Sequence, residues 1–183
     1  QGDVVVDYID RDQIKKDIAK AREKGAELLC VNMHWGDEYK LLPVPYEKEY
    51  AKFLAEQGVD LIIGGHPHVI QPIEMIHSDT LGKDMLLVYS MGNFISGMKK
   101  TDTQGGIMVK ARLKRDDDGK ARVVGAEYLP VFVVRPTGNE NFRLEIADSV
   151  TDAANAKQAK AFLESANSIF NEHNKGVTRS KEY

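Results

Sequence analysis

Three histidines are the residues of this sequence best suited to chemistry, because of where they fall. His34 ends the apolar run 27–33, and His66 and His68 follow a glycine pair after a second short apolar run. Neutral imidazole is the commonest metal ligand near neutral pH. Three imidazoles suit Zn, Mn, Fe or Ni better than Mg or Ca. We therefore expect His34, His66 and His68 to form a site for transition metals.

The residues around the second motif predict a rigid corner. Gly64 and Gly65 permit a sharp exit from a strand, and Pro67 fixes one φ angle and keeps His66 out of helical geometry. A turn can splay His66 and His68 enough for each to address a different metal of a close pair. An isolated histidine at a strand end is ordinarily a polar loop residue. Two such motifs at the ends of consecutive strands favour the metal-binding interpretation.

A βαβ unit is predicted to carry these histidines. Apolar spacing, a capping residue at Asp10 and glycine stops predict its elements. They are a helix over 11–24, a buried strand over 27–33, a helix from Pro45 to Gly58 and a buried strand over 59–63. Nearly continuous apolar strands are typical of parallel sheets covered on both faces. Ligands of such sheets gather beyond the carboxyl ends of the strands, where both histidine motifs fall.

The pattern changes after residue 70 to mostly antiparallel strands with a hairpin turn at 117–119. The predicted strands cover 73–77, 85–91, 107–115 and 122–134, and a strand is also predicted at Val4–Val6. A closing amphipathic helix is predicted within 152–171, followed by a polar tail. The fold class is therefore α/β.

Composition excludes several classes of protein. The 183 residues carry 25 Lys and Arg against 28 Asp and Glu, a net charge of -3 that gives no strong attraction for nucleic acid. No apolar run approaches the roughly 18 to 20 residues of a membrane span, so we expect this chain to be soluble. Cys30, the single cysteine, lies in an apolar run and is predicted to be a buried thiol. The start at Gln1, without an initiator Met, suggests a fragment of a longer protein.

Three ordered motifs carry a resemblance to a known family. They are Asn32-Met33-His34-Trp35-Gly36-Asp37-Glu38-Tyr39, Gly65-His66-Pro67-His68-Val69-Ile70-Gln71 and Tyr89-Ser90-Met91-Gly92-Asn93-Phe94. Together they resemble the CapA-type bacterial capsule, or poly-γ-glutamate, synthesis proteins, which are similar to the calcineurin-like metallophosphoesterases. The match runs over about residues 4–136.

The resemblance implies the architecture. Residues 1–136 would be the C-terminal half of a calcineurin-like metallophosphoesterase α/β sandwich, and 137–183 a linker and an amphipathic helix packed on the same domain. By resemblance, His34 takes the position of a lone histidine ligand, and His66 and His68 take the final pair, one per metal. The remaining ligands of the dinuclear centre would lie upstream. We therefore expect the fragment alone to bind metal weakly or not at all and to be inactive.

Other motif residues have two interpretations each. Glu38 is either an acceptor for an imidazole N–H or a substrate contact, or a solvated loop carboxylate. Asn93 orients a ligand loop or serves turn chemistry. Trp35 is more often core packing than a pocket wall.

Three functions remain open. The first is a metal-dependent phosphoesterase-like hydrolase of capsule synthesis, acting on the polymer or its phosphorylated carrier. The second is a non-catalytic module that binds the polymer or another synthesis subunit. The third is a purely structural domain with unligated histidines. For the first two, the resemblance implies the outer face of the bacterial envelope, with a membrane anchor in the full-length form. Expected partners are the missing N-terminal half and other capsule-synthesis subunits, and exposed edges would favour self-association.

Overall fold

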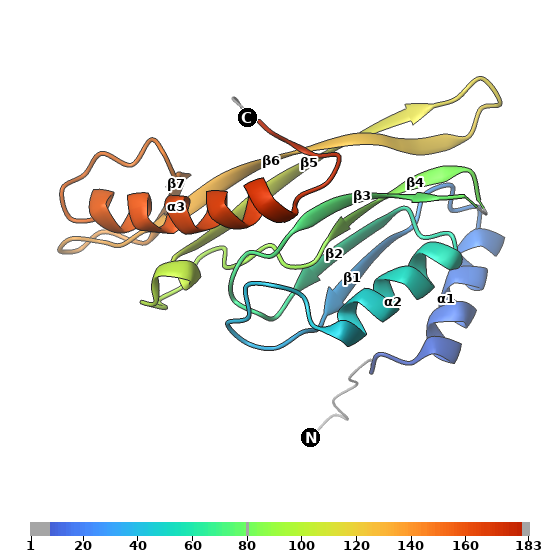
Figure 1. Cartoon of the computed structure of the whole chain (residues 1–183), viewed down its shortest axis with the longest axis horizontal. Helices are drawn as coiled ribbons and strands as arrows, with labels where there is room; N and C mark the ends of the chain where they lie inside the picture. The colour runs from blue at the N-terminus through green and yellow to red at the C-terminus, as the bar shows by residue number, and fades with distance from the viewer. Residues whose placement is uncertain (1–7, 80, 181–183) are drawn as a thin grey trace.

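A computed structural model describes residues 8–79 and 81–180, and the predicted strand at Val4–Val6 lies outside these residues. Figure 1 shows two β-sheets with helices packed against them. In chain order the elements are α1 (Arg11–Glu23), β1 (Cys30–His34), α2 (Pro45–Glu56), β2 (Leu61–Gly65), β3 (Ile73–Ser78), β4 (Lys83–Val88), the 3₁₀ turn η1 (Thr101–Thr103), β5 (Gly105–Arg115), β6 (Ala121–Val134), β7 (Arg143–Ile146), α3 (Ala156–His173) and β8 (Thr178–Arg179).

The first two helices begin and end where the sequence predicts. The Asp10 carboxylate accepts the backbone N–H of Gln13 at 2.7 Å and caps α1. The Gln13 side-chain amide donates to the Asp17 carboxylate at 3.0 Å, one turn further along the helix. Helix α2 starts at Pro45, and the Glu47 carboxylate accepts the Val44 N–H at 2.7 Å.

The first sheet has the strand order β1-β2-β4-β3, with β1, β2 and β4 parallel and β3 antiparallel. The strands β1 and β2 begin two or three residues later, and end one or two residues later, than the predicted 27–33 and 59–63. His34 pairs with Gly65 in the last register position, so both residues belong to the strands rather than to the following loops. Backbone pairing between parallel neighbours continues past the apolar residues, because it does not depend on the side chains.

Both faces of the first sheet carry a core. On one face α1 and α2 cover Met33, Ile62 and Leu87. On the other face Leu86 and Val88 pack against β6 and α3. The layers are helices, first sheet, and second sheet with α3, which confirms the predicted α/β class.

The expectation that β1 is buried on both faces is wrong. Cys30, Asn32 and His34 are exposed along one face of β1, whereas Met33 on the other face is buried. The prediction of a buried Cys30 thiol is therefore wrong too. The reason is topological: among the described residues β1 lies at the edge of its sheet, and the second sheet covers β4 but does not bury these β1 side chains.

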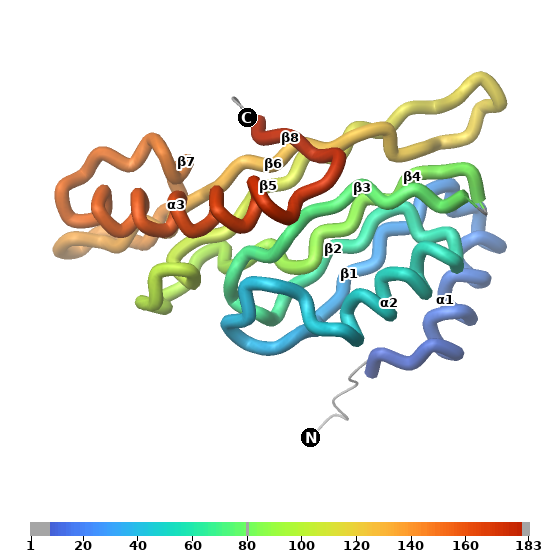
Figure 2. Tube along the Cα trace, in the orientation of Figure 1, coloured from blue at the N-terminus to red at the C-terminus, as the bar shows by residue number. Residues whose placement is uncertain are grey.

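The second sheet is built on the long antiparallel hairpin β5–β6, which confirms the mostly antiparallel second half. Figure 2 shows this hairpin reaching past the β3–β4 hairpin, where the Arg122 guanidinium donates to the Gly82 carbonyl at 3.4 Å. The short strands β7 and β8, which the sequence did not predict, pair with the edge of β6 that faces away from β5. Among the described residues, no helix is both long and apolar enough to cross a membrane.

Candidate functional site

The three predicted histidines meet at one edge of the first sheet, which we call the histidine edge (His34, His66, His68). His34 is the last residue of β1, and His66 follows the last residue of β2. The ring centroids of His34 and His66 are 4.6 Å apart, and those of His66 and His68 are 6.2 Å apart. The parallel register places the two strand ends side by side, and the Trp35 N–H donates to the Gly65 carbonyl at 3.1 Å. Imidazoles from two separate motifs thus share one surface.

The corner that carries His66 and His68 is conformationally strained. His66 has a φ of 102° and His68 a φ of 60°, in the left-handed region that residues with a Cβ rarely adopt. Each such residue costs on the order of 1–3 kcal/mol, and such strain clusters at functional sites. Gly64 allows the corner to sit close to the next strand, because a Cβ there would lie 1.9 Å from the Tyr89 carbonyl oxygen. Packing of the corner therefore holds a backbone shape that its histidines disfavour.

Hydrogen bonds fix the orientation of His68. The Asn93 amide donates from Nδ2 to the Thr103 carbonyl oxygen at 2.9 Å, so its Oδ1 is the atom that faces His68. Oδ1 only accepts, and it lies 3.0 Å from His68 Nδ1, which must therefore carry the proton. In the neutral ring the lone pair is then on Nε2. This is the arrangement in which a neighbouring acceptor orients a ligating or proton-transferring histidine.

Tyr39 lies beside His68 and Lys100 lies beside Tyr39, and sequence reasoning assigned neither a role. The Tyr39 and His68 rings stack, with their centroids 6.3 Å apart and their planes at 29°. The Lys100 ammonium lies 3.8 Å from the centre of the Tyr39 ring. Tyr39 has a φ of 66°, a third strained residue in the same region. A usable signal was present in the chain: Tyr39 closes the His34 motif, and Lys100 follows the Asn93 motif. A positive charge thus lies beside the histidine edge.

Of the other predicted residues that the structure describes, one forms a side-chain hydrogen bond to the histidine edge and two do not. Trp35 is buried at 2% exposure and its indole N–H donates to the Tyr89 carbonyl, so it is core packing rather than a pocket wall. Glu38 is exposed and interacts with the Tyr39 hydroxyl, which raises the pKa of Tyr39. In the described part of the chain, Glu38 makes no hydrogen bond to a histidine. Asn93 is the predicted residue that contacts the histidine edge directly.

Glu47 is a buried carboxyl group behind the loop that follows His34. It is fully buried, its Oε2 accepts the Val44 N–H, and its Oε1 has no hydrogen-bond partner among the residues that the structure describes. A Cβ at Gly36 would lie 2.7 Å from that Oε1, so glycine is required there to let the loop pass. Burial raises the pKa of Glu47, the Val44 N–H lowers it, and the negative charge of Asp37 raises it further.

The donor chemistry of the histidine edge fits transition metals, whereas the number of donors from this chain is small. Among residues 8–79 and 81–180, no three His, Cys, Asp or Glu side chains group closely enough to hold one metal ion. The described residues therefore bring imidazoles together without completing a coordination shell. The predicted metal site stays a prediction.

Comparison with known proteins places the chain in a family. Residues 2–98, more than half of the chain, match the model of the bacterial capsule synthesis protein family PGA_cap. The chain belongs to this family. The matched segment contains His34, His66, His68 and Asn93, the residues that meet at the histidine edge.

Individual relatives agree with the family match. The chain is 37% identical over 113 residues to a capsule biosynthesis protein CapA of Bacillus anthracis and 33% identical over 101 residues to a PGA biosynthesis protein CapA of Bacillus subtilis. These matches cover 60% and 55% of this chain but only 26% and 25% of the two relatives. A probable polyglutamine synthesis accessory protein of Mycobacterium tuberculosis is 23% identical over 138 residues, covering 70% of this chain and 35% of that protein. The chain thus spans about a quarter to a third of the length of these relatives.

Proposed function

We propose that this chain is part of an accessory protein of capsule or poly-γ-glutamate synthesis, and that its histidine edge contributes metal ligands for hydrolysis of a phosphoester in the polymer or its carrier. The family and the relatives support the biological setting. The observation that carries the chemistry is the orientation of His68. Asn93 holds its Nδ1, so that Nε2 keeps a lone pair with which to bind a metal ion. A histidine that served only the core would not need this orientation on a strained turn.

His34, His66 and His68 would hold the metal ions, Mn, Zn, Fe or Ni by their donor chemistry. When bound, a metal pair binds phosphate oxygens and lowers the pKa of a coordinated water. The chain's own residues prepare the surroundings. Asn93 keeps the His68 ring in one tautomer, and Lys100 supplies a positive charge that attracts an anionic group toward the histidine edge.

Completion of this site requires residues from elsewhere, and the structure has an open surface beside it. The exposed face of β1, with Cys30, Asn32 and His34, lies next to the histidine edge, and within residues 8–79 and 81–180 no strand pairs with the outer edge of β1. The remainder of the same domain, contributed by a longer form of the protein, would pair with β1, cover this face and bring the further ligands. The same longer form would carry the membrane anchor and the contacts with other synthesis subunits at the cell envelope.

A second candidate is a non-catalytic module that binds the polymer. It is favoured by two exposed apolar side chains, Phe94 at 68% and Ile95 at 50%, that directly follow Asn93. These side chains offer apolar contacts, and Lys100, which lies on the Tyr39 ring, offers a positive charge to an acidic chain with apolar stems. This function needs no metal at the histidine edge.

Metal content separates the two candidates. The longer protein and the 183-residue chain would be compared by elemental analysis and by hydrolysis of a generic phosphodiester. For the proposed enzyme, the longer protein holds metal stoichiometrically, and His66→Ala or His68→Ala removes both metal and hydrolysis. Asn93→Ala lowers metal affinity by about 10- to 100-fold, because the ring loses its orienting partner.

His77→Ala is the matched control, since His77 is an exposed histidine on β3 that pairs with Asp84. It should leave metal content unchanged. If the longer protein binds the polymer but takes up no metal, the result would favour the binding module over the enzyme. Equal loss of metal in the His77 and His66 variants would remove the proposed role of the histidine edge.

A further inference from the structure

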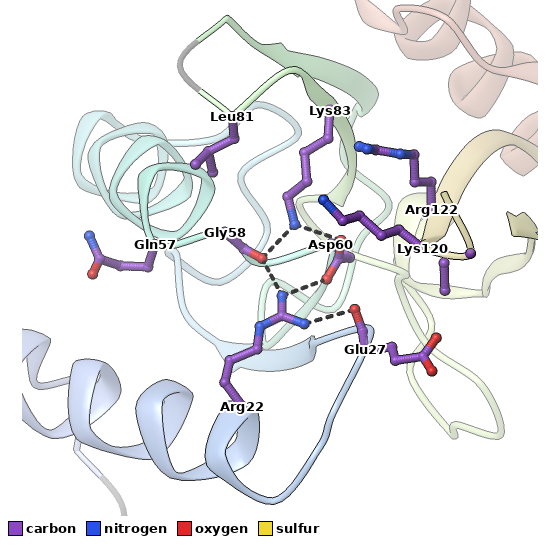
Figure 3. Close-up of a pocket in the computed structure, with 11 residues that line it drawn as sticks. Arg22, Glu27, Gln57, Gly58, Asp60, Leu81, Lys83, Lys120 and Arg122 are labelled. Atoms are coloured by element: carbon purple, nitrogen blue, oxygen red, sulfur yellow. Dashed lines mark hydrogen bonds and ion pairs between the residues drawn. The ribbon is translucent and has the colours of Figure 1, made fainter. Parts of the chain in front are cut away.

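A second polar site lies at the opposite end of the first sheet. A pocket of about 410 Å³ lies between the end of α1, the start of β2, the β3–β4 hairpin and the turn of β5–β6, and Figure 3 shows the residues that line it. Its lining includes four basic residues, Arg22, Lys83, Lys120 and Arg122, and we call it the basic pocket. The five-residue strand β2 separates this pocket from the histidine edge, a distance of about 16 Å along the strand. The two sites are therefore distinct.

Two of the four basic side chains are anchored at the floor of the pocket. The Arg22 guanidinium donates to the carbonyls of Ala26, Glu27 and Gly58 and to the Asp60 carboxylate. The Lys83 ammonium donates to the Gly58 carbonyl and to Asp60, each at 2.7 Å. An ammonium has three donors, so Lys83 keeps one for a ligand, whereas Arg22 has only its Nε–H left. The floor is thus a rigid cation pair on one buried carboxylate.

The other two basic side chains come from the hairpin turn and are freer. The Lys120 ammonium extends into the pocket, and within residues 8–79 and 81–180 it has no hydrogen bond or ion pair of its own. Arg122 pairs through Nε with Asp116, and its Nη1 makes only the long contact to Gly82, so its Nη2 remains available. Hydrogen-bond donors of Lys83, Lys120 and Arg122 therefore surround one space, and donors cannot serve as acceptors for one another.

The charges around this space do not balance. The lining carries four cationic side chains against the two acids Asp60 and Glu27. Two ion-pair partners lie just outside the lining: Arg115 pairs with Glu27, and Asp116 pairs with Arg122. With these two included, there are five positive charges against three negative ones. The excess lies with Lys83 and Lys120, because Asp60 is shared between two cations and Lys120 has none of the acids within ion-pair distance.

We propose that the basic pocket binds an oxyanion ligand, through the spare donors of Lys83, Lys120 and Arg122. A carboxylate or a phosphate group satisfies this chemistry, because both present several acceptor oxygens to point-charge and guanidinium donors. The pocket volume lies in the range of small-molecule sites and exceeds what one phosphate group occupies. A short acidic chain that offers more than one carboxylate would therefore fill it better. This proposal does not depend on metal at the histidine edge.

Titration of the 183-residue chain followed by NMR tests the proposal. The probes are a γ-linked glutamate oligomer and inorganic phosphate, each raised to about 10 mM, which detects dissociation constants near 1 mM. We expect saturable shifts of the Gly58, Lys83 and Lys120 amides with at least one probe, and stronger binding of the oligomer. Lys120→Ala should weaken the binding at least fivefold.

The matched control is Lys114→Ala, which removes the same charge from an exposed lysine of β5 that does not line the basic pocket. It should leave the affinity within about twofold. Tighter binding of phosphate than of the oligomer would assign the pocket to phosphate groups. Equal weakening by the Lys114 and Lys120 variants would mean diffuse surface attraction and overturn the proposal. Absence of saturable shifts with both probes would overturn it as well.

Discussion

The two ends of the first sheet differ in how fully their charged and polar side chains are paired. At the start of β2, Asp60 is 2% exposed and accepts hydrogen bonds from Arg22, Lys83 and the Leu29 N–H. At the other end of β2, the histidine edge contains residues in strained backbone conformations. Each carboxylate oxygen of Asp60 has a hydrogen-bond partner. The Nδ1 atom of His68 is held by Asn93, whereas its Nε2 atom keeps a lone pair for a ligand. The comparison teaches that a buried charge whose atoms all have partners serves as a structural anchor, whereas side chains that keep an atom without a partner, such as His68 and the Lys83 beside Asp60, are open to a ligand.

Removal of Asp60 should have the largest effect on stability. Asp60→Ala leaves the Lys83 ammonium, 16% exposed, and the partly exposed Arg22 guanidinium without their carboxylate. We expect the free energy of unfolding to fall by about 3 kcal/mol, measured by urea denaturation. The control Glu49→Ala breaks an exposed ion pair with Arg11 and should cost less than about 1 kcal/mol. Similar losses in the two variants would contradict the anchoring role of Asp60.

Replacement of His66 should have a smaller effect of opposite sign. His66→Gly puts glycine at a φ of 102°, which glycine adopts without strain, at an entropic cost of about 0.5–1 kcal/mol. We expect the free energy of unfolding to rise by up to about 1 kcal/mol, again in urea. His77→Gly, in the regular strand β3, should instead destabilise by about 1 kcal/mol. A clear loss of stability in His66→Gly would show that this histidine serves the fold.

Glu47 should give an effect no larger than about 1 kcal/mol, which is recognised by its pH dependence. Burial raises the pKa of Glu47, so the stability it contributes is present while it is protonated and is lost as pH rises through that raised pKa. Glu47→Gln keeps an acceptor for the Val44 N–H and carries no charge. We expect this variant to be more stable than the unmodified chain by about 1 kcal/mol near pH 7, with the difference shrinking toward pH 4.

Thermal unfolding at several pH values measures this difference. Glu56→Gln, at an exposed position of the same helix, is the control and should show no such pH dependence. A Glu47→Gln difference that is constant with pH, or that grows as pH falls, would contradict a raised pKa.

The sequence by itself determined the elements and the place where the chemistry gathers. Helices α1 and α2 lie where capping residues, apolar spacing and glycine stops predicted them, because these are local interactions. Parallel pairing of consecutive strands then brought His34 and His66 to one edge, as the βαβ pattern requires. The three motifs likewise predicted the family that the comparisons show.

Only the tertiary structure decided which of these side chains have partners. An apolar run such as 28–31 does not say whether its strand is central or at an edge, so the exposure of Cys30 depended on where the second sheet ends. Short strands such as β7 and β8 are formed by pairing with β6 rather than by their own apolar pattern. The contacts of Lys100 with Tyr39, and of Lys120 with the basic pocket, join segments distant in the chain. Such contacts follow from packing, which no local spacing of residues encodes.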